Sequence, residues 1–122
     1  MNLNDLISEY RMQTEICAAI DYSDMVTVKR NNRAVSRMYS IVEQIGRDHG
    51  EDGMRAFAVL LEERTNRTDL WAATHLLERL KPSPEIEREA LVIIEAEAAK
   101  KGADGMGYQV WLKNWKSKRD QT

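Results

Sequence analysis

The sequence has a single cysteine, Cys17, and no apolar run near the ~18 residues that a membrane-spanning helix needs. One cysteine excludes an internal disulfide and a cysteine-rich metal finger, and it fits the reducing cytoplasm, where we place the protein. The amino terminus lacks the charged-then-apolar layout of a secretory signal. Because Cys17 lies in the apolar run 16–20, we interpret it as a small buried hydrophobe rather than a nucleophile.

Histidine is also scarce, and the sequence contains no catalytic motif. His75 and Glu78 lie one helical turn apart and could touch one metal ion, but no second histidine-bearing pair accompanies them. The glycines of segment 102–107 follow no strand and precede no Gly-Lys-Ser/Thr motif, so they indicate an interhelical turn rather than a phosphate loop. We therefore predict a protein without enzymatic activity, cofactor or metal.

Apolar residues recur with a helical period, and no useful stretch alternates with a period of two. The sequence therefore predicts one all-α domain over residues 1–122, with 119–122 as a disordered tail. Short links favour antiparallel pairs, so three stacked hairpins would form a short HEAT-like array, and a globular helical bundle is the alternative. The six expected helices span about 3–20, 25–48, 51–63, 68–80, 84–101 and 105–118.

Helix ends are marked by capping residues and glycines. Gly50 is expected to end the second helix, and Thr68 to cap the fourth. Asn32 falls inside the apolar stripe of the second helix, where we interpret it as a polar contact that fixes register. The other expected caps are Asn2 or Asn4, Asp24, Ser83 followed by Pro84, and Asp104.

The helix over 68–80 is the expected centre of the fold. Its inner face is apolar, whereas Trp71, His75 and Glu78 fall on the opposite face. Such a helix is either covered on both sides or offers an aromatic patch to a partner, and the usual burial of tryptophan favours the first interpretation. The inner face is formed by Leu70, Ala73, Leu76, Leu77 and Leu80.

Charges are segregated along the chain although the net charge is only −2. The outer face of the fifth helix is acidic, with Glu85, Glu89 and Glu95 around Arg88 and Val92. Four bases on the second helix could follow phosphates, but the acidic middle of the chain disfavours nucleic acid as the partner. These bases are Lys29, Arg30, Arg33 and Arg37.

Several stretches resemble small bacterial HEAT-like helical proteins of unknown function. The stretches are 70–77, 86–97 and 107–113, and segment 29–34 is similar to the asparagine-bearing helix of that group. The resemblance spans about residues 20–116 and rests on packing residues. Proteins of this size and style resemble immunity proteins of bacterial toxin systems, including contact-dependent growth inhibition. The resemblance implies a cytoplasmic protein that binds and blocks one toxin domain.

We therefore expect a non-catalytic protein-binding module, most concretely an immunity protein that neutralises a cognate toxin such as a nuclease. The alternatives are a scaffold that self-associates through the Trp111 and Trp115 region, and a nucleic-acid-binding domain. The stripe of Tyr108, Trp111 and Trp115 is itself expected to be core. No membrane partner is expected, and the oligomeric state stays open. The candidate partner-binding residues are Trp71, His75, Glu78, Glu85, Glu89, Glu95 and Tyr108.

Overall fold

The computed structural model describes residues 1–120, and every regular element in that range is a helix. The all-α prediction is thus confirmed, while the part of the expected tail at 121–122 lies outside the described residues. The elements are α1 (Leu3–Ala18), α2 (Met25–Ala58), the 3-10 helices η1 (Val59–Glu62) and η2 (Thr65–Arg67), α3 (Thr68–Arg79), α4 (Pro84–Ala98) and α5 (Ala103–Asp120). None of these helices has the length and apolar character needed to cross a membrane.

Residues 1–120 contain five α-helices, so the expected six-helix array is not confirmed. The difference arises at Gly50, which has a non-helical backbone (φ 53°, ψ −134°) inside α2. Glycine tolerates positive φ without a steric penalty, and helical hydrogen bonding resumes directly after it. The break expected at Gly50 is thus present as a kink, and the expected second and third helices are joined across it into one element, α2.

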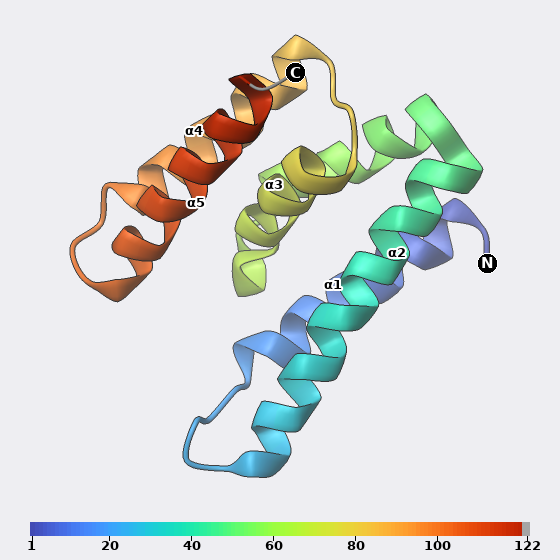
Figure 1. Ribbon diagram of the computed structural model, residues 1–122. Coiled ribbons are helices and arrows are strands. Elements are labelled where there is room, and N and C mark those ends of the chain that lie inside the picture. Colours follow the sequence, from blue (N-terminus) through green and yellow to red (C-terminus); the bar gives the residue numbers. More distant parts are fainter. Residues whose placement is uncertain (121–122) are drawn as a thin grey trace.

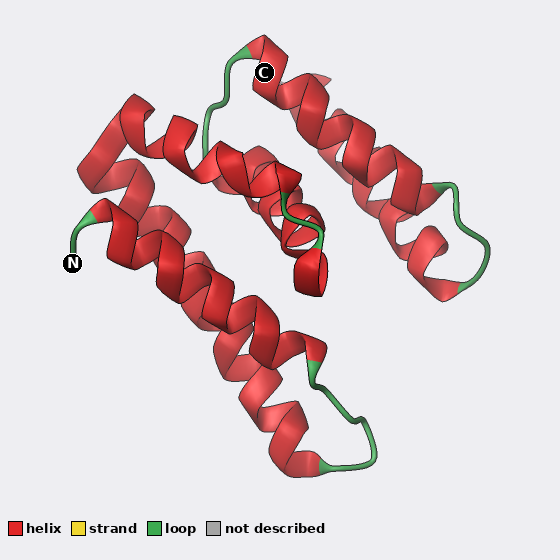
Figure 2. Cartoon of the chain, turned by 180° about the vertical axis from the view of Figure 1, so that it is seen from behind, coloured by secondary structure: helices red, strands yellow, loops and turns green. Residues whose placement is uncertain are grey.

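The helices form two hairpins with α3 between them. α1 packs along α2, and α4 packs along α5, while α3 contacts both α2 and α4 (Figure 1). The view from behind shows the same order, with the turn between α1 and α2 projecting away from the other helices (Figure 2). The central position expected for the helix over 68–80 is thus confirmed, but the HEAT-like set of three hairpins is not.

The core lies where α1, α2 and α3 meet, and α4 extends it. Burial of each large apolar side chain stabilises the fold by roughly 1.5–3 kcal/mol, so this region holds most of the stabilising apolar contacts. In α5 only Gly105 is buried, and the aromatic side chains of that helix are half-buried. The largest fully buried apolar side chains are Tyr10, Phe57, Leu6, Met38, Ile41, Ile45, Leu60, Leu76, Ile94 and Val42.

Three of the expected caps are confirmed. The side chains of Asn2, Asp24 and Ser83 each accept a hydrogen bond from a backbone amide in the first turn of α1, α2 and α4. Each cap satisfies one of the amides that the start of a helix leaves without an intrahelical partner, which is typically worth about 1 kcal/mol. Local sequence was sufficient here because a cap involves residues that are two or three positions apart.

Three expectations about polar residues are wrong. Thr68 is the first residue of α3 rather than its cap, and its hydroxyl donates instead to the carbonyl of Thr65. Asp104 lies within the first turn of α5, which already begins at Ala103. Asn32 is exposed, because the buried face of α2 passes through Ala34 and Met38 instead. Cys17, in contrast, is buried as expected, and burial raises the pKa of its thiol.

Candidate partner-binding site

His75, one of the expected partner-binding residues, lies in the core. Its side chain is 1% exposed, and its Nδ1 is 2.7 Å from the Tyr10 hydroxyl oxygen, with which it shares a hydrogen bond. The ring of Tyr39 lies 4.4 Å from the imidazole, centroid to centroid. His75 therefore joins α3 to α1 and α2, and no partner can reach it while these helices are packed.

Burial keeps this cluster uncharged at neutral pH. It lowers the pKa of His75 from 6.5 to about 4, because the interior solvates an imidazolium poorly. Burial likewise raises the pKa of Tyr10 well above its ordinary value, so the phenol keeps its proton. The pair is a neutral hydrogen-bonded contact inside the core, which removes it from the candidate binding surface.

Glu78 connects three helices through its carboxylate. One oxygen accepts from the hydroxyl of Tyr39 on α2 and the other from the indole N–H of Trp111 on α5, each at 2.7 Å. Burial, with the adjacent Glu78 carboxylate, raises the pKa of Tyr39 to about 12. Arg79 lies over the Tyr39 ring, 4.9 Å from its centroid. Glu78 is thus exposed, but both of its carboxylate oxygens already accept hydrogen bonds from the same chain.

The aromatic stripe of α5 faces α3, as the core interpretation expected. Tyr108 shares a hydrogen bond of 3.3 Å with the hydroxyl of Thr74, and burial raises the pKa of its phenol. Trp111 and Trp115 stack at 6.2 Å between ring centroids, with 7° between the ring planes. A groove of about 810 Å³ runs between these rings and the end of α3, where Leu77 is part of its wall.

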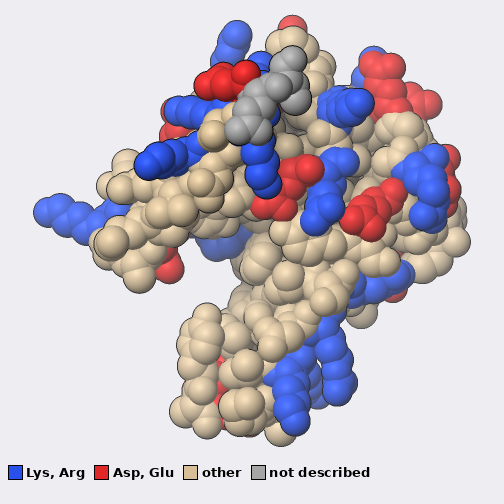
Figure 3. Space-filling view, in the orientation of Figure 1, with Lys and Arg blue, Asp and Glu red and all other residues tan. Residues whose placement is uncertain are grey.

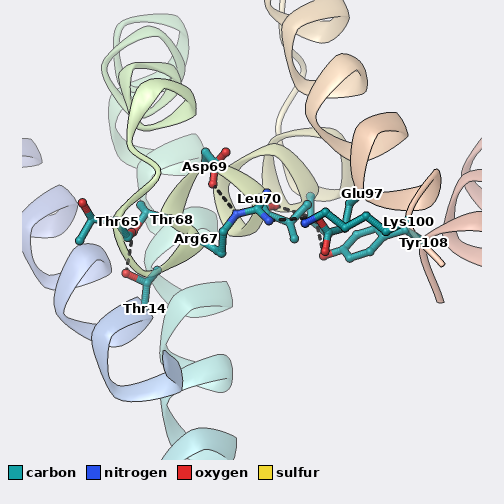
Figure 4. Close-up of polar contacts among 10 residues, drawn as sticks. Thr14, Thr65, Arg67, Thr68, Asp69, Leu70, Glu97, Lys100 and Tyr108 are labelled. Atoms are coloured by element: carbon teal, nitrogen blue, oxygen red, sulfur yellow. Dashed lines mark hydrogen bonds and ion pairs between the residues drawn. The ribbon is translucent and has the colours of Figure 1, made fainter. Parts of the chain in front are cut away.

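A buried ion-pair network connects the start of α3 to the end of α4, and sequence analysis missed it. Arg67 donates to Asp69 at 3.2 Å and to Glu97 at 3.0 Å, and both carboxylate side chains are less than a tenth exposed (Figure 4). The Lys100 ammonium, with Arg67, holds the pKa of Glu97 below its usual range. Thr14 on α1 meets the Thr68 hydroxyl at 2.8 Å beside this network.

The backbone at this network is left-handed at two consecutive non-glycine residues, Asn66 (φ 56°) and Arg67 (φ 54°). Such a conformation costs of order 1 kcal/mol or more for each residue. It lets the Arg67 side chain lie between the two carboxylates, so the ion pairs offset the strain. No local sequence signal marks this arrangement, because Glu97 lies thirty positions from Arg67.

The acidic residues of α4 fall into two groups. Glu87 pairs with Arg119, and Glu97 pairs with Arg67 and Lys100. The second group comprises Glu85, Glu89 and Glu95, which are exposed and form no ion pair within residues 1–120. Val92, 61% exposed, lies among them, while the opposite face of α4 buries Ala90, Ile94 and Ala98. We call Glu85, Arg88, Glu89, Val92 and Glu95 the acidic face.

The expected partner-binding residues thus separate into two places. One place is α3 and the adjacent part of α5, with Trp71, His75 and Glu78 on α3 and Tyr108 on α5. His75 is buried there, and Trp71 and Tyr108 are half-buried. The three glutamates of the acidic face lie together on α4 and face solvent. Among residues 1–120, no three His, Cys, Asp or Glu side chains are arranged to hold a metal ion.

Comparisons with known proteins were made for the whole chain. No family model, no curated protein and no solved structure matches it.

Proposed function

We propose that the protein is a non-catalytic binding module that uses the acidic face of α4 to engage a basic protein partner. The observation that carries this proposal is the contrast within α4. Its inward acids, Glu87 and Glu97, are neutralised by bases of the same chain, whereas its outward acids have no such partners within the described residues. Val92 adds an exposed apolar contact at the middle of the face.

The narrower proposal is an immunity protein that neutralises a cognate toxin in the cytoplasm. A nuclease toxin has a cationic surface for its substrate, and an acidic helix could occupy that surface and speed association by electrostatic steering. Val92 rather than Trp71 supplies the apolar contact in this proposal, because Trp71 is half-buried and packs against the core. Association through Trp111 and Trp115 is less favoured, because their indole N–H groups already donate to Glu78 and Leu77.

The test is titration calorimetry with the purified protein encoded by the reading frame next to that of this chain. We expect sub-micromolar binding that is weakened at least about tenfold when the three acids of the face become lysine. A control variant carries the same charge change on exposed acids elsewhere and should bind within about twofold of the unchanged protein. The face variant is Glu85→Lys, Glu89→Lys and Glu95→Lys, and the control is Asp5→Lys, Asp52→Lys and Glu62→Lys.

The salt dependence of the association rate gives a second readout. The rate should fall as sodium chloride increases, and it should fall less steeply for the face variant, because fewer charges then steer the encounter. Equal losses in the face and control variants would show that net charge, not this surface, drives binding. No interaction at about 1 μM would contradict the immunity-protein proposal itself.

A further inference from the structure

The turn between α1 and α2 exposes a group of large apolar side chains. We call residues 12–33, which form the projecting end of this hairpin, the hairpin tip (Figure 1). Met12 is 59% exposed, Tyr22 82%, and Met25 and Val26 63% each. Single exposed apolar residues are ordinary, but a group of them marks an interaction surface.

A small groove between the two helices lies within the hairpin tip. Its volume is about 290 Å³. Met12, Glu15 and Ile16 from α1, with Ala19 just after that helix, lie across it from Thr27 and Arg30 of α2. One wall thus combines apolar side chains with the Glu15 carboxylate, while the Arg30 guanidinium lies on the other side. This combination suits an apolar side chain that enters the groove next to a carboxylate.

The bases of the hairpin tip have no acidic partners within residues 1–120. Lys29, Arg30 and Arg33 are exposed and form no ion pair with any residue of 1–120. Arg37, the next base along α2, pairs with Glu9 instead. Positive side chains accordingly line one side of the lower projection in Figure 3. The tip therefore presents positive charge next to apolar surface.

Asp21 and Asp24, the two acids at the turn, help to distinguish between lipid, nucleic acid and protein as the partner of the hairpin tip. The carboxylate of Asp21 accepts from the amide and hydroxyl of Ser23, which lowers its pKa, and Asp24 caps α2. Insertion into lipid would bury these charges at a large cost. A nucleic acid would contact the bases but leave the methionines in water. A protein surface avoids both penalties because it can place apolar and acidic groups at separate positions.

We propose that the hairpin tip is a second docking site, which binds an acidic amphipathic helix of a partner protein. The apolar face of that helix covers Met12, Ile16 and Met25, and its carboxylates pair with Lys29, Arg30 and Arg33. Recognition of a helix in an apolar groove needs anchors spaced by about one turn, and acids beside those anchors complement the three bases. The site does not depend on the acidic face of α4, so the two proposals stand or fall separately.

The experiment uses the full chain with labelled methionine and isoleucine methyl groups, followed by NMR. The probe is a synthetic helical peptide of about 18 residues, with leucine on one face and glutamate on the other. A matched peptide carries lysine in place of glutamate. We expect the acidic peptide to shift the methyl signals of Met12, Ile16 and Met25, and to bind at least about tenfold more tightly than the basic peptide.

Two charge variants locate the binding site. Arg30→Glu with Arg33→Glu should weaken binding of the acidic peptide about tenfold, because two attractions become repulsions. Lys101→Glu with Lys113→Glu makes the same charge change at exposed residues on the other hairpin and should leave the affinity within about twofold. All four side chains are exposed, and circular dichroism with thermal melting checks that both variants fold.

Several results would overturn the proposal. Equal affinity for the acidic and the basic peptide would show that the bases of the hairpin tip do not select the partner by charge. Peptide-induced shifts confined to Ile93 and Ile94 on α4, or to Met106 on α5, would place binding on the other hairpin. Binding to phosphatidylserine vesicles or to a DNA duplex, without binding to the acidic peptide, would assign the tip to lipid or to nucleic acid.

Discussion

The two ends of the α1–α2 hairpin are built from similar residues but have opposite environments. Near α3, Tyr10 and Met38 are completely buried, whereas at the hairpin tip Tyr22 is 82% exposed and Met25 63% exposed. The same hairpin supplies all four side chains, so amino-acid type does not account for the difference. It arises because α3 covers one end of the hairpin and nothing within residues 1–120 covers the other. Apolar side chains thus stabilise the fold at the end near α3, whereas at the hairpin tip they are exposed to solvent.

Substitution of Met25 and of Met38, both on α2, should give the largest difference between the two ends. Met38→Ala should lower the free energy of unfolding by about 3 kcal/mol, because it removes buried apolar surface and leaves a cavity. Met25→Ala should change it by less than about 0.5 kcal/mol. Urea denaturation followed by circular dichroism measures both. Similar losses in the two variants would show that the tip is packed in solution and would contradict the comparison.

Acid should destabilise the buried end through His75. Its pKa is about 4 in the folded protein and near 6.5 when unfolded, so between these values the unfolded chain binds more protons. The contribution of His75 to stability is therefore complete above pH 6.5 and is lost as the pH falls towards 4. We expect a loss of about 2 kcal/mol between pH 7 and pH 5.

A histidine variant separates this effect from the titration of carboxylates. His75→Gln, which keeps a polar group near Tyr10, should flatten the dependence of unfolding free energy on pH between 7 and 5, relative to the unchanged protein. Urea titrations at a series of pH values give the slopes. An unchanged slope in His75→Gln would mean that other groups control the acid response.

Structural features with a local cause could be predicted from the sequence. The caps at Asn2, Asp24 and Ser83 depend on neighbouring residues, and the apolar face of α3 depends on a helical period. The same reasoning located the kink at Gly50, where positive φ favours glycine, but it did not predict that the helical segments on both sides join into one element.

Most of the contacts that define the candidate sites could not be predicted from one sequence. Tyr10 and His75 lie 65 positions apart, and Glu78 bonds to residues on two other helices. The acidic face could be predicted because its residues share one side of one helix. Burial of His75, the Arg67 network and exposure of the hairpin tip depend on which helices meet, and an amphipathic period does not specify that.

The smallest expected difference concerns two arginines on α2. Arg37 pairs with Glu9 on α1, and both side chains are partly exposed, so Arg37→Ala should destabilise the fold by only about 0.5 kcal/mol. Arg33→Ala removes no ion pair and should leave stability unchanged, but it should weaken binding of the acidic peptide about threefold. Arg37→Ala should leave that affinity unchanged, since Glu9 already occupies its guanidinium. The reverse result, with peptide binding lost only in Arg37→Ala, would move the docking site from the hairpin tip towards the buried end.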